Sequence, residues 1–254
     1  MCVLALAIRW HPDWPLVLAG NRDELHARPA APLARWAETP QVLGGRDLEG
    51  GGTWLGVSEQ GRLAVVTNLR GFGPPHPDAP SRGLLARDFL MGEGRYARFG
   101  EADLAAFNPM NLIVAEGAVV RFCANRPGPS VRELGSGIYG LSNGDLDAPW
   151  PKTRRLKAAL ADWLDGAGPE PDALFAALAD ETRPTDAELP STGLDLERER
   201  LVSPIFIRNQ PYGTRCSTVV RVDAAGRGEI IERRFDPGGG LAGVTALNFS
   251  WPPG

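Results

Sequence analysis

Short apolar runs, separated by residues that favour turns, dominate the pattern of the chain. The run 2–9 is almost continuously apolar and is followed by a proline-rich turn, which predicts a buried strand with 16–19 as its hairpin partner. We expect residues 20–23 to form the turn at which this second strand ends. Because the strands of a hairpin are antiparallel, that turn would lie beside residue 2.

Further hairpins are indicated by apolar runs on either side of short polar turns. They are expected at 53–58 with 62–67, 111–115 with 118–123, and 216–222 with 228–235, and a last strand at 242–248. The proline-rich stretch 28–40 is predicted to be an extended loop, and the glycine-rich stretch 44–52 a flexible one.

Amphipathic helices are predicted between these groups of strands. The clearest follows Pro151, where Leu156, Leu160 and Trp163 fall on one apolar stripe. Others are expected at 81–91, 96–107 and 172–179.

The segment 183–204 is polar and interrupted by proline, so we expect a long surface loop that sets ligand preference. The order of strands, helices, strands, helices and strands predicts an α+β fold with mainly antiparallel sheets. Because helices must cover the apolar sheet faces, we expect a four-layer αββα sandwich in a single domain over 1–254.

Composition narrows the classes of function. The chain has 254 residues, 43% of them hydrophobic and 23% charged, with a formal net charge of -4, which excludes a disordered or fibrous protein. Its arginines are scattered among acidic residues, so we expect no nucleic-acid partner. No apolar stretch approaches the roughly 20 residues that span a bilayer. We therefore expect a cytoplasmic protein without an integral membrane segment, acting on a small-molecule substrate or ligand.

Three cysteines are present, Cys2, Cys123 and Cys216, and they form no CxxC motif. A disulfide framework and a structural zinc site are therefore not supported, and no metal site is expected. If Met1 is removed, Cys2 carries the free α-amino group, so that one residue supplies both a sulfur nucleophile and a base. The alternative is that Cys2 is a small buried residue at the start of a strand.

Four other residues could support cysteine chemistry. Asp23 could hold the α-ammonium group or orient the thiol, and Asn68 and Asn143 could donate amide hydrogen bonds to an oxyanion. Arg215 could keep a thiolate ionised or bind a substrate carboxylate. Asn, Asp and Gly also favour turns, so each position alone has a structural alternative.

Taken together, a set of short motifs resembles the Asn-Arg-Asp-Glu (NRDE) family, also called the transport and Golgi organisation family. The resemblance extends from residue 1 to about 235 and rests on Cys2 after Met1, Gly20-Asn21-Arg22-Asp23-Glu24, Arg28-Pro29, Gly45-Arg46-Asp47, Gly51-Gly52-Thr53-Trp54, Thr67-Asn68-Leu69-Arg70, Ser81-Arg82-Gly83, Gly140-Leu141-Ser142-Asn143 and Tyr212-Gly213-Thr214-Arg215.

This family is in turn similar to the N-terminal nucleophile hydrolases of the bile-salt and penicillin V acylase type, which have a helix-sheet-sheet-helix sandwich. The resemblance implies Cys2 as nucleophile, Asp23 near the free amine, Asn68 and Asn143 as active-site amides, and Arg215 as the late arginine. It differs in one respect, because the acylases carry an arginine before the asparagine of this loop, whereas here Gly20 precedes Asn21 and Arg22 follows it. Asn21, Arg22 and Trp54 are expected to contact substrate.

The sequence therefore predicts two alternative functions. The first is a cysteine N-terminal nucleophile hydrolase that cleaves a linear amide and needs no cofactor. The alternative is a non-catalytic protein that binds or transports haem or an acyl-type ligand in the same pocket. Haem binding would have to use Cys2 or a histidine, and His11, His26 and His76 all lie in turn-like or proline-rich contexts without a CxxCH motif.

Overall fold

The structure, a computed structural model, describes residues 2–166 and 170–252. The chain divides into two compact units, each assembled from separate segments. The first comprises Met1–Ala27, Ser136–Ala224 and Ile231–Val244, and the second comprises Arg28–Gly135, Ala225–Ile230 and Thr245–Gly254. The single domain expected over 1–254 stays a prediction.

Most of a six-stranded sheet belongs to the first unit. In spatial order its strands are β10 (Gly137–Leu141), β1 (Cys2–Ile8), β2 (Leu16–Leu25), β11 (Tyr212–Val222), β12 (Arg227–Phe235) and β13 (Leu241–Ser250). β1 pairs with β2 and β10, and β2 with β11, all antiparallel. β1, where residue 2 is located, therefore lies between β2, its neighbour in sequence, and β10 from the middle of the chain.

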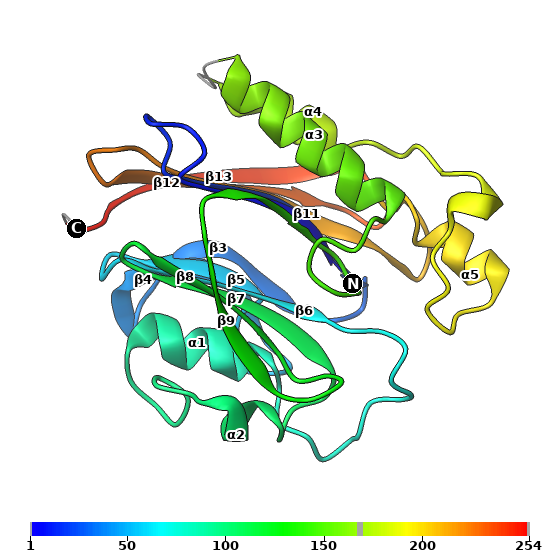
Figure 1. Cartoon of the computed structure of the whole chain (residues 1–254), viewed down its shortest axis with the longest axis horizontal. Coiled ribbons are helices and arrows are strands. Elements are labelled where there is room, and N and C mark those ends of the chain that lie inside the picture. The colour runs from blue at the N-terminus through cyan, green and yellow to red at the C-terminus, as the bar shows by residue number, and fades with distance from the viewer. Residues whose placement is uncertain (1, 167–169, 253–254) are drawn as a thin grey trace. The chain divides into compact units, whose positions relative to one another are not determined.

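Two helices cover one face of this sheet. α3 (Pro151–Asp165) packs on β1 and β10, and α4 (Asp172–Leu178) packs on β2 and β11 (Figure 1). Their buried core includes Val3, Ala5, Ala19, Leu156, Leu160, Trp163, Leu174 and Leu178. Because side chains alternate along a strand, Val3 and Ala5 face the helices and Cys2 and Leu4 face the opposite side of the sheet.

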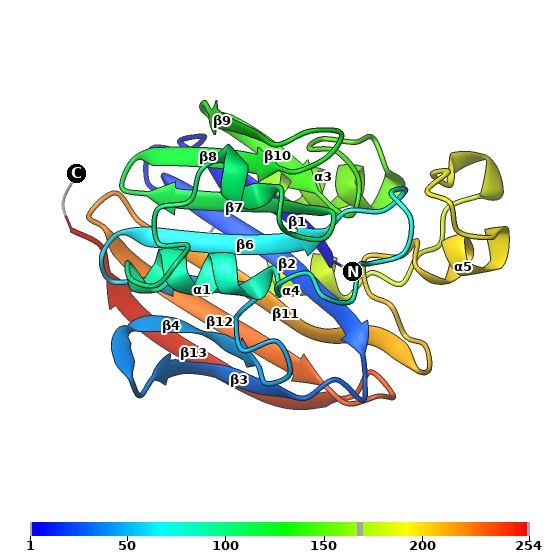
Figure 2. The same ribbon diagram turned by 90° about the horizontal axis from the view of Figure 1, so that it is seen from below.

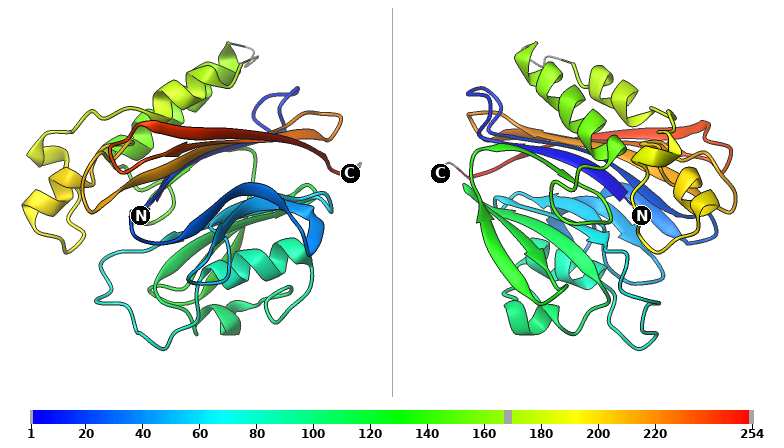
Figure 3. Two further views of the ribbon diagram at one scale, coloured as in Figure 1. Left: turned by 180° about the vertical axis from the view of Figure 1, so that it is seen from behind. Right: turned by 45° about the vertical axis from the view of Figure 1, so that its right-hand side comes forward.

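The predicted loop 183–204 contains more structure than expected. It holds a 3₁₀ turn, η1 (Asp186–Glu188), and a short helix, α5 (Leu196–Leu201), beyond one end of the sheet (Figure 3). The Asp195 side chain caps α5 by accepting a hydrogen bond from the backbone N–H of Arg198 at 2.8 Å. The buried Lys152 Nζ of α3 donates to the Val202 carbonyl at 3.0 Å, which ties the end of this segment to the unit.

The second unit contains a seven-stranded sheet whose spatial order follows the chain. Its strands are β3 (Ala30–Trp36), β4 (Thr39–Asp47), β5 (Leu55–Ser58), β6 (Arg62–Asn68), β7 (Met110–Glu116), β8 (Val119–Ala124) and β9 (Ser130–Leu134), all antiparallel to their neighbours. α1 (Gly83–Met91) lies across β4, β5 and β6 (Figure 2), and α2 (Glu101–Leu104) follows.

Four expectations about the first 110 residues were wrong in whole or in part. Residues 20–23 do not form a turn, because β2 continues through them to Leu25. The proline-rich stretch 28–40 forms β3 and the start of β4 instead of a loop, and 44–47 belongs to β4. Pro32 is compatible with this because β3 is an edge strand and its pairing with β4 is irregular between Ala31 and Ala34. The helix expected at 96–107 is limited to Glu101–Leu104.

The α+β class with mainly antiparallel sheets is confirmed. Each of the two sheets has helices packed on one face, so two helix layers and two sheet layers are present, as an αββα sandwich requires. None of the helices among the described residues combines the length and apolar composition needed to cross a membrane.

Candidate active site

Cys2 is the first residue of β1 and lies directly opposite Arg22 of β2. Residues paired across strands project from the same face of a sheet, so the two side chains share the face that α3 and α4 leave uncovered. Cys2 is partly exposed, whereas Arg22 is 6% exposed. The strand pairing therefore places a guanidinium group beside the thiol.

Asp23 is fixed next to Cys2 by contacts with β11. Its Oδ1 accepts a hydrogen bond from the Thr214 hydroxyl at 2.7 Å, and its carbonyl oxygen accepts one from the Tyr212 hydroxyl at 2.7 Å. Thr214 is itself held, since its hydroxyl also lies 2.9 Å from the backbone N–H of Ile207. The backbone N–H of Asp23 donates a hydrogen bond to the sulfur of Cys2. A buried carboxylate and the thiol are thus parts of one rigid arrangement.

The surroundings set the protonation of the Cys2 thiol. Burial raises its pKa, and the Asp23 carboxylate raises it further, whereas the Arg22 guanidinium and the Asp23 backbone N–H lower it. The net direction is upward, so the thiol is protonated at neutral pH. A nucleophilic Cys2 therefore needs a base within reach.

Asn143 is brought to Cys2 by β10. In the pairing of β1 with β10, Leu4 lies opposite Leu141, and the next residue along, Ser142, donates its hydroxyl to the Cys2 carbonyl oxygen at 2.7 Å. Asn143 follows and is fully buried. This register therefore brings the segment that carries Asn143 to the start of β1.

The loop after Asn143 is closed by contacts between Gly140 and Asp147. The Gly140 N–H donates to Asp147 Oδ1 at 2.8 Å, and the Asp147 N–H donates to the Gly140 carbonyl at 2.8 Å. A side chain at position 140 would collide with α3, because an added Cβ would lie 2.3 Å from Thr153 Cγ2. The Gly-Leu-Ser-Asn motif thus fixes where Asn143 lies.

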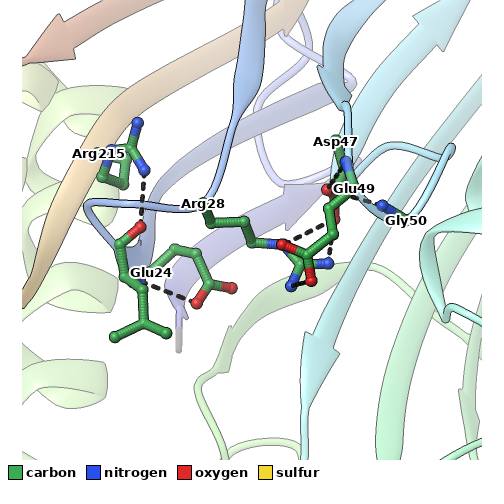
Figure 4. Close-up of polar contacts among 7 residues, drawn as sticks. Glu24, Arg28, Asp47, Glu49, Gly50 and Arg215 are labelled. Carbon is green, nitrogen blue, oxygen red and sulfur yellow. Dashed lines mark hydrogen bonds and ion pairs between the residues drawn. The ribbon is translucent and has the colours of Figure 1, made fainter.

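Arg215 is the extra residue of a β-bulge. The register of β11 against β2 shifts between Thr214, opposite Asp23, and Cys216, opposite Arg22. Arg215 Nη1 donates to the Leu25 carbonyl at 2.8 Å, the bond drawn beside Glu24 in Figure 4. Burial and the nearby Arg22 lower the pKa of Arg215, which Cys216 and Glu24 oppose. The bulge therefore adds a second cation next to Arg22.

Asn21 has a structural role. Its Nδ2 donates to the carbonyl oxygens of Leu178 at 2.8 Å and Ile205 at 2.9 Å, and its Oδ1 accepts from the Ser217 hydroxyl at 2.6 Å. It is 3% exposed. These bonds connect β2 to the end of α4 and to β11, so the contacts of Asn21 give no support to its expected role in substrate binding.

Asn68 and Trp54 belong to the second unit. Asn68 is the last residue of β6 and lies opposite Met110. The Trp54 ring covers the backbone of Gly45, where an added Cβ would lie 2.3 Å from Trp54 Cη2. The roles expected for Asn68 in oxyanion binding and for Trp54 in substrate binding stay predictions.

Other motif residues stabilise the second unit. Arg28 Nη2 and Nη1 form ion pairs with Asp47 Oδ2 at 2.8 Å and Glu49 Oε1 at 3.0 Å, and Asp47 Oδ1 accepts from the backbone N–H of Gly50 at 3.1 Å (Figure 4). Burial acts to raise the pKa of Asp47, but the hydrogen bonds from Arg28 and the backbone outweigh it and lower the pKa.

Cys216, Glu232 and Thr214 are buried polar or thiol residues near this site that we did not single out from the sequence. Thr214 and Cys216 flank Arg215 in the Tyr-Gly-Thr-Arg-Cys run, so their position beside a predicted site residue was the available signal. Glu232 follows two isoleucines in β12, and a carboxylate within an apolar stretch is the sequence feature that could have indicated a buried charge.

The histidines are all engaged with nearby backbone. His26 Nε2 lies 2.9 Å from the Asn209 carbonyl, and the Nδ1 atoms of His11 and His76 accept from the N–H groups of Asp13 and Asp78. Among the residues that the structure describes, no group of three or more His, Cys, Asp or Glu side chains could hold a metal ion. Haem as a ligand stays a prediction.

Residues 1–237 match the sequence profile of the family described as Transport and Golgi organisation 2. The Transport and Golgi organization protein 2 homolog of Bos taurus is 36% identical over 257 residues, and the Mus musculus homolog 34% over 257 residues, in both cases covering 92% of each chain.

The solved structures that align with this chain are more distant in sequence. A mutant conjugated bile acid hydrolase from Clostridium perfringens aligns with a TM-score of 0.49 and 8% identity over 98% of this chain and 92% of that one. An N-acylethanolamine-hydrolyzing acid amidase ortholog from Caenorhabditis elegans aligns with a TM-score of 0.47 and 16% identity over 86% of this chain and 92% of that one. On the sequence matches, this chain belongs to the Transport and Golgi organisation 2 family.

Proposed function

We propose that this protein is a cysteine hydrolase of the N-terminal nucleophile type that cleaves a linear C–N amide bond of a small acyl-amide substrate. The observation that supports this most strongly is the setting of Cys2. Its sulfur accepts the Asp23 N–H, its carbonyl accepts the Ser142 hydroxyl, and Asn143 follows Ser142. The residues that would serve as nucleophile, carboxylate and amide donor therefore come together at one end of β1.

The first step requires removal of Met1, which converts the nitrogen of Cys2 into a primary amine. An α-amino group has a pKa of about 7.7–8.0, so it can accept the proton of a thiol whose own pKa is raised by burial. The Cys2 sulfur then attacks the substrate carbonyl carbon, which forms the S–C bond and places negative charge on the carbonyl oxygen. The Asp23 carboxylate would hold the resulting ammonium group.

The tetrahedral intermediate then loses its amine. The C–N bond breaks, the ammonium of Cys2 returns its proton to the leaving nitrogen, and a thioester remains on the sulfur. Water adds to the thioester with the same amine as base, and the acid leaves as the thiol is restored. Asn143 would donate its side-chain amide to the oxyanion in both halves of the reaction. Asn68 remains the predicted second donor.

The cations at the site have a separate part in this proposal. Arg22 and Arg215 lie next to one another in the β2–β11 pairing, one of them directly opposite Cys2. A guanidinium group favours the thiolate and can bind an anionic end of a substrate in bidentate fashion. Thiol, amine and water supply every bond and proton of the reaction, so it proceeds without a cofactor.

The test is hydrolysis of a panel of linear acyl amides by the wild type, Cys2→Ala and the matched control Cys123→Ala. Cys123 is fully buried in the second unit, and burial raises its pKa to about 12, so it has no part in the chemistry. We expect turnover by the wild type and Cys123→Ala and none by Cys2→Ala. Haem binding whose spectral shift survives Cys2→Ser, without turnover of any amide, would instead support the ligand-carrier function.

A further inference from the structure

A row of side chains, buried beyond Cys2, crosses the first sheet on the face opposite α3 and α4. Cys2 of β1 lies opposite Arg22 of β2, and Arg22 lies opposite Cys216 of β11. On the next strand, β12, the Glu232 carboxylate hydrogen-bonds with the Cys216 thiol. Arg22, Cys216 and Glu232 are 6%, 4% and 2% exposed. The row therefore leads from the nucleophile to a buried carboxylate three strands away.

Both charged groups lie close to the same sulfur atom. Burial and the Glu232 carboxylate raise the pKa of Cys216 well above its ordinary value, and the Arg22 guanidinium lowers it. Neighbouring strands are about 4.8 Å apart, so β2 and β12 are separated by roughly 10 Å. The long side chains of Arg22 and Glu232 can cover this distance above a residue as short as cysteine.

Because Arg22 and Glu232 are buried, the electrostatic interaction between their charges affects the stability of the site. An isolated charge removed from water costs several kcal/mol unless an opposite charge compensates it. The half-buried Arg234 lies on the same side of Glu232, with its Nε 3.9 Å from Oε1. A carboxylate at the far side of Cys216 would draw the guanidinium of Arg22 into place on the face where Cys2 lies.

We infer that Glu232 is a positioning residue that holds the Arg22 guanidinium beside the Cys2 thiol. The inference rests on the proposed role of Cys2 as nucleophile, but it concerns thiol reactivity and can therefore be tested without a substrate. Cys216 takes part as a neutral thiol packed between the two charges. Glu232 does not touch the reacting atoms and acts only through Arg22.

The charged and titratable groups around the Cys2 thiol determine the sign of the expected effect. They are the α-amino group, Arg22 and Asp23 of β2, Arg215 and Cys216 of β11, and Glu232 of β12. Loss of a negative charge by itself would make the site more positive and favour the thiolate. If Glu232 holds Arg22 in place, its loss instead lets the guanidinium move away and disfavours the thiolate. The two mechanisms predict opposite shifts.

The experiment follows alkylation of Cys2 by iodoacetamide as a function of pH, with Cys2 distinguished from Cys123 and Cys216 by peptide mass mapping. The variants are Glu232→Gln, Arg22→Gln, the double variant and Glu232→Asp, with Glu229→Gln as a matched control on the opposite face of β12. Thermal unfolding of each variant is measured in parallel.

We expect Glu232→Gln to react about three- to tenfold more slowly than wild type at pH 7, with its pH midpoint moved upward as in Arg22→Gln. The double variant should be no slower than Arg22→Gln, because both changes remove the same interaction. Glu232→Asp, which keeps the charge but has a shorter reach, should be intermediate, and Glu229→Gln should match wild type.

An unchanged or lowered midpoint in Glu232→Gln, or additive effects in the double variant, would overturn the inference. If Glu232→Gln does not fold, a wild-type midpoint in Glu232→Asp would overturn it equally. Failure of the protein to hydrolyse amides would leave these alkylation results standing, so the inference and the proposed function can fail separately.

Discussion

The Ser142 hydroxyl donates a hydrogen bond of 2.7 Å to the carbonyl oxygen of Cys2. This bond joins the loop that carries Asn143 to the residue that would be the nucleophile, although the two are about 140 positions apart in the chain. Together with the Asp23 N–H on the sulfur, it fixes Cys2 from both neighbouring strands.

Replacement of Asp23 by Asn should abolish most of the activity. The ammonium form of the Cys2 amine would lose its counter-charge, and proton transfer by a positioned group is typically worth about 10²–10⁴-fold in rate. We expect kcat/KM on a responsive amide to decrease by a factor of about 10²–10⁴. Thr214→Val removes only one hydrogen bond to Asp23 and should cost much less. Wild-type turnover in Asp23→Asn would contradict the role given to the carboxylate.

Asn143→Ala should lower kcat by about 10²–10³, the usual cost of losing one oxyanion donor. The alkylation rate of Cys2 should not change, because the amide acts on the substrate oxygen and not on the thiol. Asn248→Ala, at an exposed position of β13, is the matched control and should have no effect. Equal losses of alkylation and turnover in Asn143→Ala would indicate that this residue only supports the fold of the site.

The ion pair of Arg28 and Asp47 should contribute to stability in acid. The pKa of Asp47 in the folded state lies below its unfolded value of about 3.9. Its contribution is therefore present at every pH above that value and is lost as pH falls through the folded pKa. In urea titrations, Asp47→Asn should flatten the decline of the unfolding free energy below about pH 4. The exposed Asp186, paired with Arg200, is the control, and Asp186→Asn should change the decline less.

Gly52→Ala should destabilise the second unit without touching the cysteine chemistry. An added Cβ would lie 2.2 Å from the carbonyl carbon of Gly83, where α1 begins, so backbone would have to move. Overpacking of this kind costs about 1–3 kcal/mol. Gly128→Ala meets nothing within 4 Å and should be neutral in the same chemical denaturation experiment. Equal stability of the two variants would show that this close approach is not required.

Elements with strong local signals could be predicted from the sequence. The hairpins at 53–67 and 111–123 have alternating or continuous apolar runs around a short turn, and α3 has a regular apolar stripe, so short-range pattern specifies each of them. Membership of the family was also predictable, because its motifs are continuous stretches of sequence.

The continuation of β2 through Asn21, Arg22 and Asp23 could not be predicted in this way. Their polar side chains are typical of turns, and their partners, such as the Leu178 carbonyl and the Thr214 hydroxyl, are more than 150 residues away. That these residues lie beside Cys2 could be predicted, because the pairing of β1 with β2 follows from a local hairpin. The position of Glu232 relative to Arg22 depends on the order of β2, β11 and β12 in the sheet, and no local sequence pattern specifies that order.

The central claim is that Cys2 acts only when its own α-amino group is free. The most direct measurement compares two preparations of the same chain, one beginning at Cys2 and one retaining Met1, each verified by intact mass. Turnover of a responsive amide is then measured for both, with accumulation of a thioester on Cys2 followed by mass spectrometry. We predict turnover and the Cys2 thioester only in the preparation that begins at Cys2. Equal turnover by the chain that retains Met1 would contradict the mechanism.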